Sequence, residues 1–310
     1  MRAGRRRGWP NWLGWLLGLL LLVAPPLAEA QNQAQSPAAK ALAARHLALR
    51  QALLDNQFQR PLYLESSQGG GRLQGDIYAE LEQPYALVSP MLLGMAQWCD
   101  ALILHLNVKA CHPAPASAGA LLKLYIGRKH DQPLADAYPF AFRFKVQAAE
   151  ADYLRVLLSA AQGPLGTSDY RMQLEVLALA GGRSLIHLSY AYAYGMTASL
   201  AMQGYLASVG RDKVGFSIIG TTATGQPQYL GDMRGVMERN TMRYYLALDA
   251  YLGALALPAA AQQDKRLHDW HLGVERYPRQ LHEMELAPYL AMKHREIRRQ
   301  QQLAAAAARP

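Results

Sequence analysis

The stretch "DMRGVMERNTMRYYLALDAYLGALAL", residues 232–257, decides the fold of this chain. It predicts one long helix, because Asp232 can cap the first turn and Pro258 ends the last one. Its apolar side chains recur at helical spacing and form one broad face: Met233, Met237, Tyr244, Leu248, Tyr251 and Leu255. It is the strongest helix signal in the 310 residues.

Before this helix, apolar and polar residues alternate with the two-residue period of β-strands. Strands are predicted at 73–81, 102–111, 120–127, 139–160, 168–179 and 183–195. Two of them place apolar or aromatic residues on one face. In the segment 139–160 these are Phe140, Phe142, Phe144 and Val146, and in the segment 183–195 they are Tyr190, Tyr192 and Tyr194. The pair Gly181–Gly182 predicts a hairpin turn. These features are typical of an antiparallel sheet with one covered face.

Helices are predicted on both sides of the strand region. Residues 31–60 have Ala and Leu at helical spacing after Ser36–Pro37, and further helical signals cover 84–100 and 197–211. The glycine-rich segment 66–72 predicts a flexible break. The chain is therefore expected to divide into an N-terminal helical segment (31–65), a main domain (66–257) and a basic helical tail (258–310).

The first 30 residues have the three-part layout of a secretory signal peptide. Four arginines within 2–7 form the basic region, residues 12–23 the apolar core, and an A-x-A pattern ending at Ala30 the cleavage signal. The apolar run is shorter than the roughly 20 residues that a membrane span needs. An uncleaved anchor is the alternative. We expect a periplasmic or secreted protein that is cleaved after Ala30.

The charge of the mature chain is modest. Cleavage takes away four arginines and one glutamate, so the formal net charge falls from +9 to about +6. The remaining Lys and Arg are scattered as far as the tail, and export argues against a nucleic-acid partner. A membrane surface or an acidic ligand stays open as a partner.

The order of the elements resembles the helix-grip fold of the START-like superfamily, which includes lipid-transfer domains and polyketide cyclase-like proteins. The resemblance covers roughly residues 72–257. It is carried by "PYALVSPMLLGMAQWCD" (84–100) after the first strand and by "ERNTMRYYLALDAYL" in the closing helix. It implies an α+β fold in which a curved antiparallel sheet wraps around the C-terminal helix and encloses an apolar cavity. The helical segment at 197–211 departs from this pattern and leaves the number of strands open.

The segments "WCD", "LHLNVKAC", "GPLGTSDY" and "ERNTMRYYLA" also resemble an exported proteobacterial family of unknown function. Neither resemblance brings a catalytic motif. The chain has no G-x-S-x-G elbow and no H-E-x-x-H motif. We expect no cofactor.

Cys99 and Cys111 are the only cysteines and allow three interpretations. A zinc site would add His105 and His112, although zinc ligands usually come in tight pairs such as C-x2-C. A catalytic thiol would need a lowered pKa and a positioned base. Export and the even cysteine count favour the third interpretation, a disulfide, over the zinc site and over the catalytic thiol. Because ten extended residues span about 33 Å, the bridge requires the strand at 102–111 to start late or to bend.

The densest polar row on any predicted strand is His105, Asn107 and Lys109. These residues share one face of 102–111 and either face water or line a ligand cavity. In a cavity, His105 is a candidate acid or base. Asp169, in the turn "GPLGTSDYR" (163–171), is a second catalytic candidate if this loop lies at the cavity mouth. Otherwise it belongs to an ordinary hairpin loop.

The long helix carries a cluster of charged residues. Arg239 and Arg243 lie one helical step apart, with Tyr244 beside them, so they could receive an anionic head group. Alternatively they form ion pairs with acids of the tail, Glu275 or Glu283. Tyr190 and Tyr192 on the sheet are further candidates for orienting a ligand.

These features together favour an exported protein that holds a hydrophobic or amphipathic small molecule between its sheet and its long helix. Affinity would come mainly from buried apolar area. An enzyme on the same scaffold, cyclase-like or hydrolase-like, is the first alternative. A structural or assembly protein of the cell envelope is the second, because fold does not imply function.

Overall fold

The computed structural model describes residues 35–307 except positions 115 and 209. The predicted signal peptide, residues 1–30, lies outside the described residues. From Pro37 onward the chain forms one compact unit. Within the described residues, no helix is sufficiently long and apolar to span a membrane.

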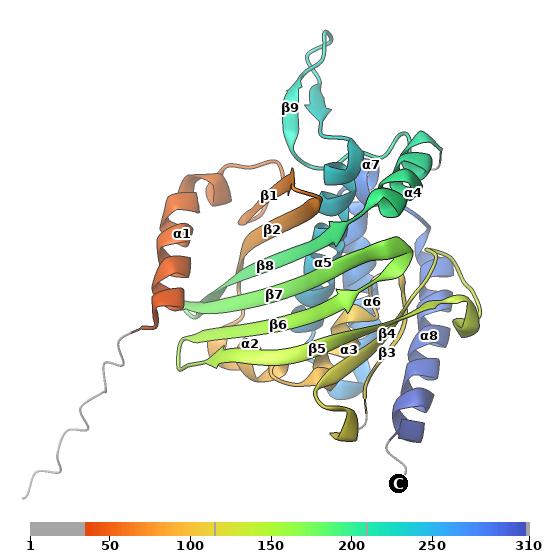
Figure 1. The fold of residues 1–310 in the computed structure, drawn as a ribbon. Helices are drawn as coiled ribbons and strands as arrows, with labels where there is room; N and C mark the ends of the chain where they lie inside the picture. Colours follow the sequence, from red (N-terminus) through yellow and green to blue (C-terminus); the bar gives the residue numbers. More distant parts are fainter. Residues whose placement is uncertain (1–34, 115, 209, 308–310) are drawn as a thin grey trace, which may run out of the picture. The chain divides into compact units, whose positions relative to one another are not determined.

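An eight-stranded antiparallel sheet is the main layer of this unit (Figure 1). Its strand order is β1-β2-β8-β7-β6-β5-β4-β3. Its strands are β1 (Leu62–Gly69), β2 (Arg72–Leu81), β3 (Val108–Pro113), β4 (Leu121–Ile126), β5 (Tyr138–Ala149), β6 (Tyr153–Gln162), β7 (Thr167–Leu179) and β8 (Arg183–Tyr194). The segment predicted as strand from 139 to 160 is thus two strands joined by a hairpin.

The helices lie mostly behind the sheet in the view of Figure 1. They are α1 (Pro37–Leu54), α2 (Tyr85–Leu92), α3 (Met95–Leu102), α4 (Met196–Ala207), α5 (Asp232–Gly253), α6 (Ala259–Glu275), α7 (Pro278–Leu281) and α8 (Leu286–Ala307). A small hairpin, β9 (Ile218–Thr221) and β10 (Pro227–Tyr229), projects from one end.

The predicted long helix is confirmed as α5, and it packs against β1, β2 and β8 on what we call the inner face of the sheet. The α+β helix-grip fold is therefore confirmed. Buried residues occur all round α5 rather than on one face. The reason is that α3 and α6 cover the sides of α5 that the sheet leaves free.

The predicted alternation on the sheet is also confirmed. Phe140, Phe142 and Phe144 are buried on the inner face, and so are Tyr190 and Tyr192. Val146 is 37% exposed, contrary to the prediction, and the pairing of β5 with β6 shifts register directly after it. A β-bulge of this kind turns the following residues out of phase.

The glycine-rich segment at 66–72 is not a flexible break. Residues up to Gly69 belong to β1, and Gly70 and Gly71 form the turn into β2 with φ of 56° and 71°. Positive φ at both central residues is typical of a type I′ hairpin turn, and glycine adopts it without strain. The predicted N-terminal helical segment, 31–65, therefore contains α1 followed by the start of an extra edge strand.

The prediction of one helix over 84–100 and a strand over 102–111 is wrong in detail. Two helices, α2 and α3, replace the single helix, and α3 continues to Leu102. Turn hydrogen bonds follow, from the N–H of Leu104 to the carbonyl of Ala101 and from that of His105 to Leu102. Regular strand begins only at Val108. Local turn bonding thus overrides the two-residue alternation of this segment.

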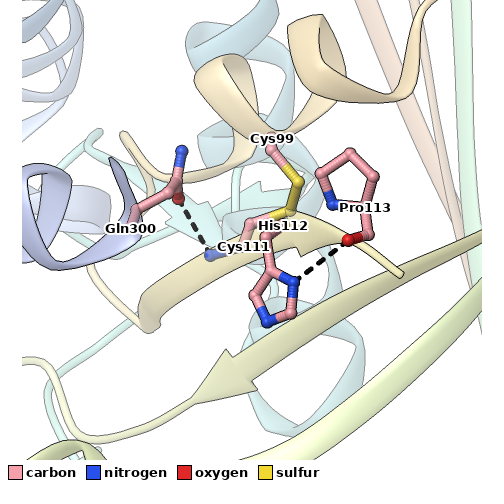
Figure 2. Close-up of a disulfide and its surroundings, with 5 residues drawn as sticks. All are labelled: Cys99, Cys111, His112, Pro113 and Gln300. Atoms are coloured by element: carbon pink, nitrogen blue, oxygen red, sulfur yellow. Dashed lines mark hydrogen bonds between the residues drawn. A yellow bond between two sulfur atoms is a disulfide. The ribbon is translucent and has the colours of Figure 1, made fainter. Parts of the chain in front are cut away.

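The late start of β3 is what permits the disulfide. Cys99 on α3 and Cys111 on β3 are bonded, with their Cα atoms 5.1 Å apart, so the disulfide interpretation is confirmed (Figure 2). Both residues are buried in the main core. The N–H of Cys111 also donates to Oε1 of Gln300 on α8, at 2.8 Å. The bridge therefore fixes α3 to β3 at the point where α8 also binds.

The terminal helices pack on the sheet domain instead of extending from it. α1 covers part of the outer face of the sheet, where its residues Leu42, Leu49 and Leu53 join a second apolar cluster. α6 packs on α5, and α8 packs on α6 and on β3. The rings of Trp270 on α6 and Tyr289 on α8 stack with centroids 5.0 Å apart.

Candidate functional site

A cavity of about 340 Å³ lies where α4 and α5 meet the inner face of β8. Five tyrosines line it, and we call it the tyrosine cavity: Tyr170, Tyr190, Tyr192, Tyr194 and Tyr205. Met202 from α4, Met233 and Asn240 from α5, and the short turn at Pro164–Leu165 complete the wall. The lining is mostly apolar and aromatic, as ligand pockets usually are.

Strand alternation places the tyrosines. Tyr190, Tyr192 and Tyr194 occur at every second position of β8, so their rings lie on the same face. Tyr170 lies on this face as well, because it alternates in phase with the buried Met172 and Leu174 of β7. The rings of Tyr170 and Tyr192 then stack with centroids 5.1 Å apart. The result is a nearly continuous aromatic wall.

The phenols of Tyr170, Tyr190 and Tyr192 are neutral at physiological pH, because the pKa of each is raised. Burial raises the pKa of Tyr190 well above its ordinary value, with smaller effects from Tyr244, Tyr170 and Tyr192. Burial likewise raises the pKa of Tyr192. A neutral phenol can both donate and accept a hydrogen bond, so these groups suit a polar atom of a largely apolar ligand.

Several predicted ligand residues gather beside the tyrosine cavity. The ring of Tyr244 on α5 lies 5.2 Å from that of Tyr190 and 4.5 Å from that of His105. Arg239 and Arg243 lie on α5 next to Tyr244, and both are 1% exposed. The structure therefore brings together His105, Tyr190, Tyr192, Tyr244 and the two arginines. Their role in ligand binding stays a prediction.

His105 is a buried, neutral imidazole. Burial lowers its pKa well below 6.5, and the charges of Arg243, Lys293, Lys129 and Lys109 act in the same direction. Its Nδ1 accepts the N–H of Asn107 at 3.1 Å, so the proton of the neutral ring is on Nε2. Nε2 has no hydrogen-bond partner among the described residues. In this state His105 offers a ligand a hydrogen-bond donor rather than a base.

The predicted polar row of His105, Asn107 and Lys109 does not exist as one strand face. The side chain of Asn107 donates to the carbonyl of Gly127 at 2.6 Å and so stabilises the turn before β3. Lys109 is fully buried and its Nζ lies 3.0 Å from Glu296 on α8. These two residues point to different neighbours because only Lys109 lies in regular strand.

Lys109 belongs to a buried ion triad that joins α8 to β3. Glu296 accepts from Lys109 at 3.0 Å and from Lys293 at 2.8 Å, and all three side chains are at most 1% exposed. Lys293 also donates to the carbonyls of His105 and Val108. Burial lowers the pKa of Lys293 to about 8, against the attraction of Glu296. The triad carries a net positive charge and a single carboxylate.

Asp169, the second catalytic candidate, lies on the outer face of the sheet. It is 3.7 Å from Arg72 and its side chain is 65% exposed. It lines a different hollow, together with Arg143 and Arg171, on the opposite side from the tyrosine cavity. The structure does not bring Asp169 and His105 together, and the catalytic assignments of both stay predictions.

The outer face of the sheet carries a polar network that was not predicted from the sequence. His187 on β8 lies between two carboxylates: Nε2 is 3.0 Å from Asp76, and Nδ1 is 2.7 Å from Glu175. Tyr78 stacks on its ring at 4.2 Å. This network borders a hollow of about 690 Å³ with a mostly polar lining, which includes Arg72, Arg155 and Arg171. Strand alternation could have found it, because Asp76, Glu175 and His187 all alternate with inner-face residues.

The His187 network predicts a pH dependence of stability. Burial opposes ionisation, but the hydrogen bonds to Asp76 and Glu175 raise the pKa of His187 above 6.5. A histidine whose pKa is raised by folding contributes its full stabilisation of the folded state below pH 6.5. This stabilisation is lost as pH rises through the pKa of the folded state. The pKa values of Asp76 and Glu175 are lowered despite burial, chiefly by His187, so their contributions are lost only when pH falls below 3.8 and 4.5.

We therefore expect His187→Gln to cost about 1.5–3 kcal/mol near pH 6 and less as pH rises. Urea unfolding across a pH series would measure this difference. His130→Gln, on an exposed residue, is the matched control. A difference between wild type and His187→Gln that does not change with pH would contradict the prediction.

In the part of the chain that the structure describes, no three His, Cys, Asp or Glu side chains gather as a metal site would require. In the His187 network both ring nitrogens already face carboxylates. The cysteines are bonded to each other. The described residues therefore offer no evident metal ligand set.

The antiparallel sheet and the long helix across its inner face define an α+β protein with the helix-grip architecture, and a cavity lies beside that helix. No protein-family model matches the sequence, and no curated protein matches it either.

Three similar solved structures have low sequence identity. The Zhui aromatase/cyclase from a Streptomyces species is 12% identical, with 64% of this chain and 98% of that chain covered and a TM-score of 0.36. Human StAR-related lipid transfer protein 5 is 9% identical, with 70% and 95% covered and a TM-score of 0.34. A norcoclaurine synthase from Thalictrum flavum is 13% identical, with 48% and 90% covered and a TM-score of 0.30.

Proposed function

We propose that this protein is an exported carrier that binds a hydrophobic or amphipathic small molecule in the tyrosine cavity. The observation that carries the proposal is the cavity itself: about 340 Å³ of space walled by aromatic and thioether side chains between the sheet, α4 and α5. The cavity is open to solvent on one side, so its apolar wall contacts water in the free protein. A bound apolar molecule would remove this apolar surface from water.

The lining explains how such a ligand would bind. Each 100 Å² of apolar ligand surface that leaves water contributes about 2.5 kcal/mol. Aromatic rings such as those of Tyr170 and Tyr192 add stacking contacts. The neutral hydroxyls of Tyr190 and Tyr192, and the side chain of Asn240, would fix the orientation of the ligand through a few hydrogen bonds.

Export is part of the proposal. A disulfide between Cys99 and Cys111 suits an oxidising compartment, and the first 30 residues have the layout of a signal peptide. A protein that acts outside the cytoplasm can accept an apolar molecule at one site and release it at another.

The test is extraction and mass spectrometry of small molecules from protein purified from its native source, compared with an Ala201→Trp variant. Ala201 lines the cavity, so an indole at this position would fill the space. We expect wild type to release a defined apolar compound and Ala201→Trp to release at most about a tenth of it, the fold-change that 1.4 kcal/mol produces. The intact mass of the purified protein would also show whether the chain is cleaved after Ala30 and so begins at Gln31.

Ala207→Trp is the matched control, because Ala207 is an exposed residue at the end of the same helix and is not part of the cavity wall. It should retain the compound. Equal amounts of compound from wild type and Ala201→Trp would place binding elsewhere. The absence of any compound from wild type, with no apolar probe bound in solution, would count against a carrier.

A further inference from the structure

The interior next to the tyrosine cavity holds more positive than negative charge. Arg243 donates to Glu283 at 2.7 Å, and Lys129 donates to the same carboxylate oxygen at 2.5 Å. Arg239 lies beside them and forms no ion pair among the described residues. One carboxylate, Glu283, therefore faces three cations.

The nearest other carboxylate, on Glu238, is not available to Arg239. Glu238 accepts hydrogen bonds from the hydroxyls of Ser66 and Ser217 and from the backbone N–H groups of Phe216 and Ser217, all between 2.6 and 2.9 Å. Both of its oxygens are thus engaged. Glu238 attracts Arg239 through its charge but forms no ion pair with it, so among the described residues Glu283 is the carboxylate that pairs with the cations of this cluster.

Three hydrogen-bond donors in this interior have no partner among the described residues: Nη1 of Arg239, Nε of Arg243 and Nε2 of His105. Each belongs to a side chain of a residue that is at most 2% exposed. Buried donors are almost always satisfied, and a buried cation without a counter-charge is strongly unfavourable. Such donors together indicate a place for an anion.

The tyrosine cavity lies next to this cluster, with Tyr205 and Asn240 in its wall. Tyr205 lines the cavity, and its hydroxyl lies close enough to Arg239 to influence its ionisation. Nζ of Lys129 lies 5.9 Å from the centre of the Tyr205 ring. Asn240, adjacent to Arg239 on α5, also forms part of the cavity wall. Tyr205 is therefore the side chain that separates the apolar space from the cations.

We propose that the ligand carries one anionic group, a carboxylate or a phosphate, which binds Arg239 and Arg243 while its apolar part occupies the tyrosine cavity. Guanidinium groups bind carboxylates and phosphates through charge-assisted, often bidentate hydrogen bonds. The Nε2–H of His105 is a further donor without a partner among the described residues. This inference rests on the proposed carrier function and specifies the chemistry of its ligand.

The test compares ligands that differ only in their head group. Calorimetric titration of the purified, ligand-stripped protein with decanoate, decyl phosphate and decanol measures the contribution of the negative charge. We expect the better of the two anions to bind at least about tenfold more tightly than decanol. The comparison of decanoate with decyl phosphate distinguishes a carboxylate ligand from a phosphate ligand.

Arg239→Met should weaken binding of the anions more than binding of decanol and so reduce this difference. Glu283 keeps its pairing with Arg243 and Lys129 in this variant, so we expect the ligand-free protein to unfold at the same temperature as wild type or higher. Arg239→Lys, which keeps the charge, should retain part of the preference. Arg234→Met is the matched control, because Arg234 lies on the same helix but donates to Ser66.

Equal affinities for decanol and both anions would overturn the anionic ligand and leave the carrier function intact. An Arg239→Met variant that unfolds at a lower temperature and keeps the wild-type preference would show that Arg239 is structural. If none of the three compounds binds and no compound co-purifies, the carrier function fails as well.

Discussion

Glu296→Gln is expected to destabilise the protein by about 3–5 kcal/mol, the cost of removing one partner from a buried ion pair. Among the described residues, Glu296 is the carboxylate that pairs with the fully buried ammonium groups of both Lys109 and Lys293. Glutamine has nearly the same shape but no charge, so both lysines would lose their counter-charge at once. Chemical unfolding at neutral pH measures the loss.

The loss of stability caused by Glu296→Gln should become smaller at alkaline pH. The pKa of Lys293 is already lowered to about 8, chiefly by burial, and a neutral lysine needs no counter-charge. Glu285→Gln is the matched control, since Glu285 is exposed and begins the same helical region. If Glu296→Gln were as stable as Glu285→Gln at neutral pH, the triad would not hold α8 in place.

Replacing both cysteines, Cys99→Ala with Cys111→Ala, should cost about 2–4 kcal/mol, as for other disulfides that close short loops. The bond links residues 12 apart in sequence and joins α3 to β3. Its loss would allow α3 to separate from the strand in the unfolded ensemble and would loosen the segment that holds His105. Thermal unfolding with and without reductant measures the effect.

Reductant should lower the unfolding temperature of wild type and leave that of the double variant unchanged. Titration of thiols in denatured, unreduced wild type should find none. Two free thiols, or a double variant as stable as wild type, would show that the bridge does not form or does not stabilise.

Local periodicity was sufficient to predict most of the fold. α5 was predictable because its apolar spacing extends over many turns, and the strands of the sheet because their residues alternate between water and core. The segment 102–107 shows the limit of this reasoning. Its alternation of apolar and polar residues suits a strand, yet turn hydrogen bonds such as His105 N–H to Leu102 determine its structure.

The predicted disulfide was incompatible with a strand that extends over all of 102–111. A bridge between Cys99 and Cys111 is impossible if 102–111 is fully extended, so the bridge itself requires a late start for β3. The predicted disulfide and the predicted strand, taken together, therefore limited the structure of this segment more than either prediction did alone.

Only part of the candidate site could be predicted. Tyr190, Tyr192 and Tyr244 followed from strand alternation and helix phase. Tyr205 could not be found, because α4 has no counterpart in the simple sheet-and-helix pattern. The partner of Lys109 could not be found either, since Glu296 lies 187 residues further along the chain. Contacts over such distances are set by packing of the whole unit, not by local sequence.

The position of α8 has a consequence for the protein in concentrated solution. β3 is the last strand of the sheet, so one of its edges has no neighbouring strand. Open strand edges recruit other chains and are a common origin of aggregation. Gln300 accepts the Cys111 N–H, and Lys293 donates to the Val108 carbonyl, so backbone groups that could pair with a foreign strand are occupied by side chains of α8. The last helix thus hinders a second chain from pairing with the β3 edge of the sheet.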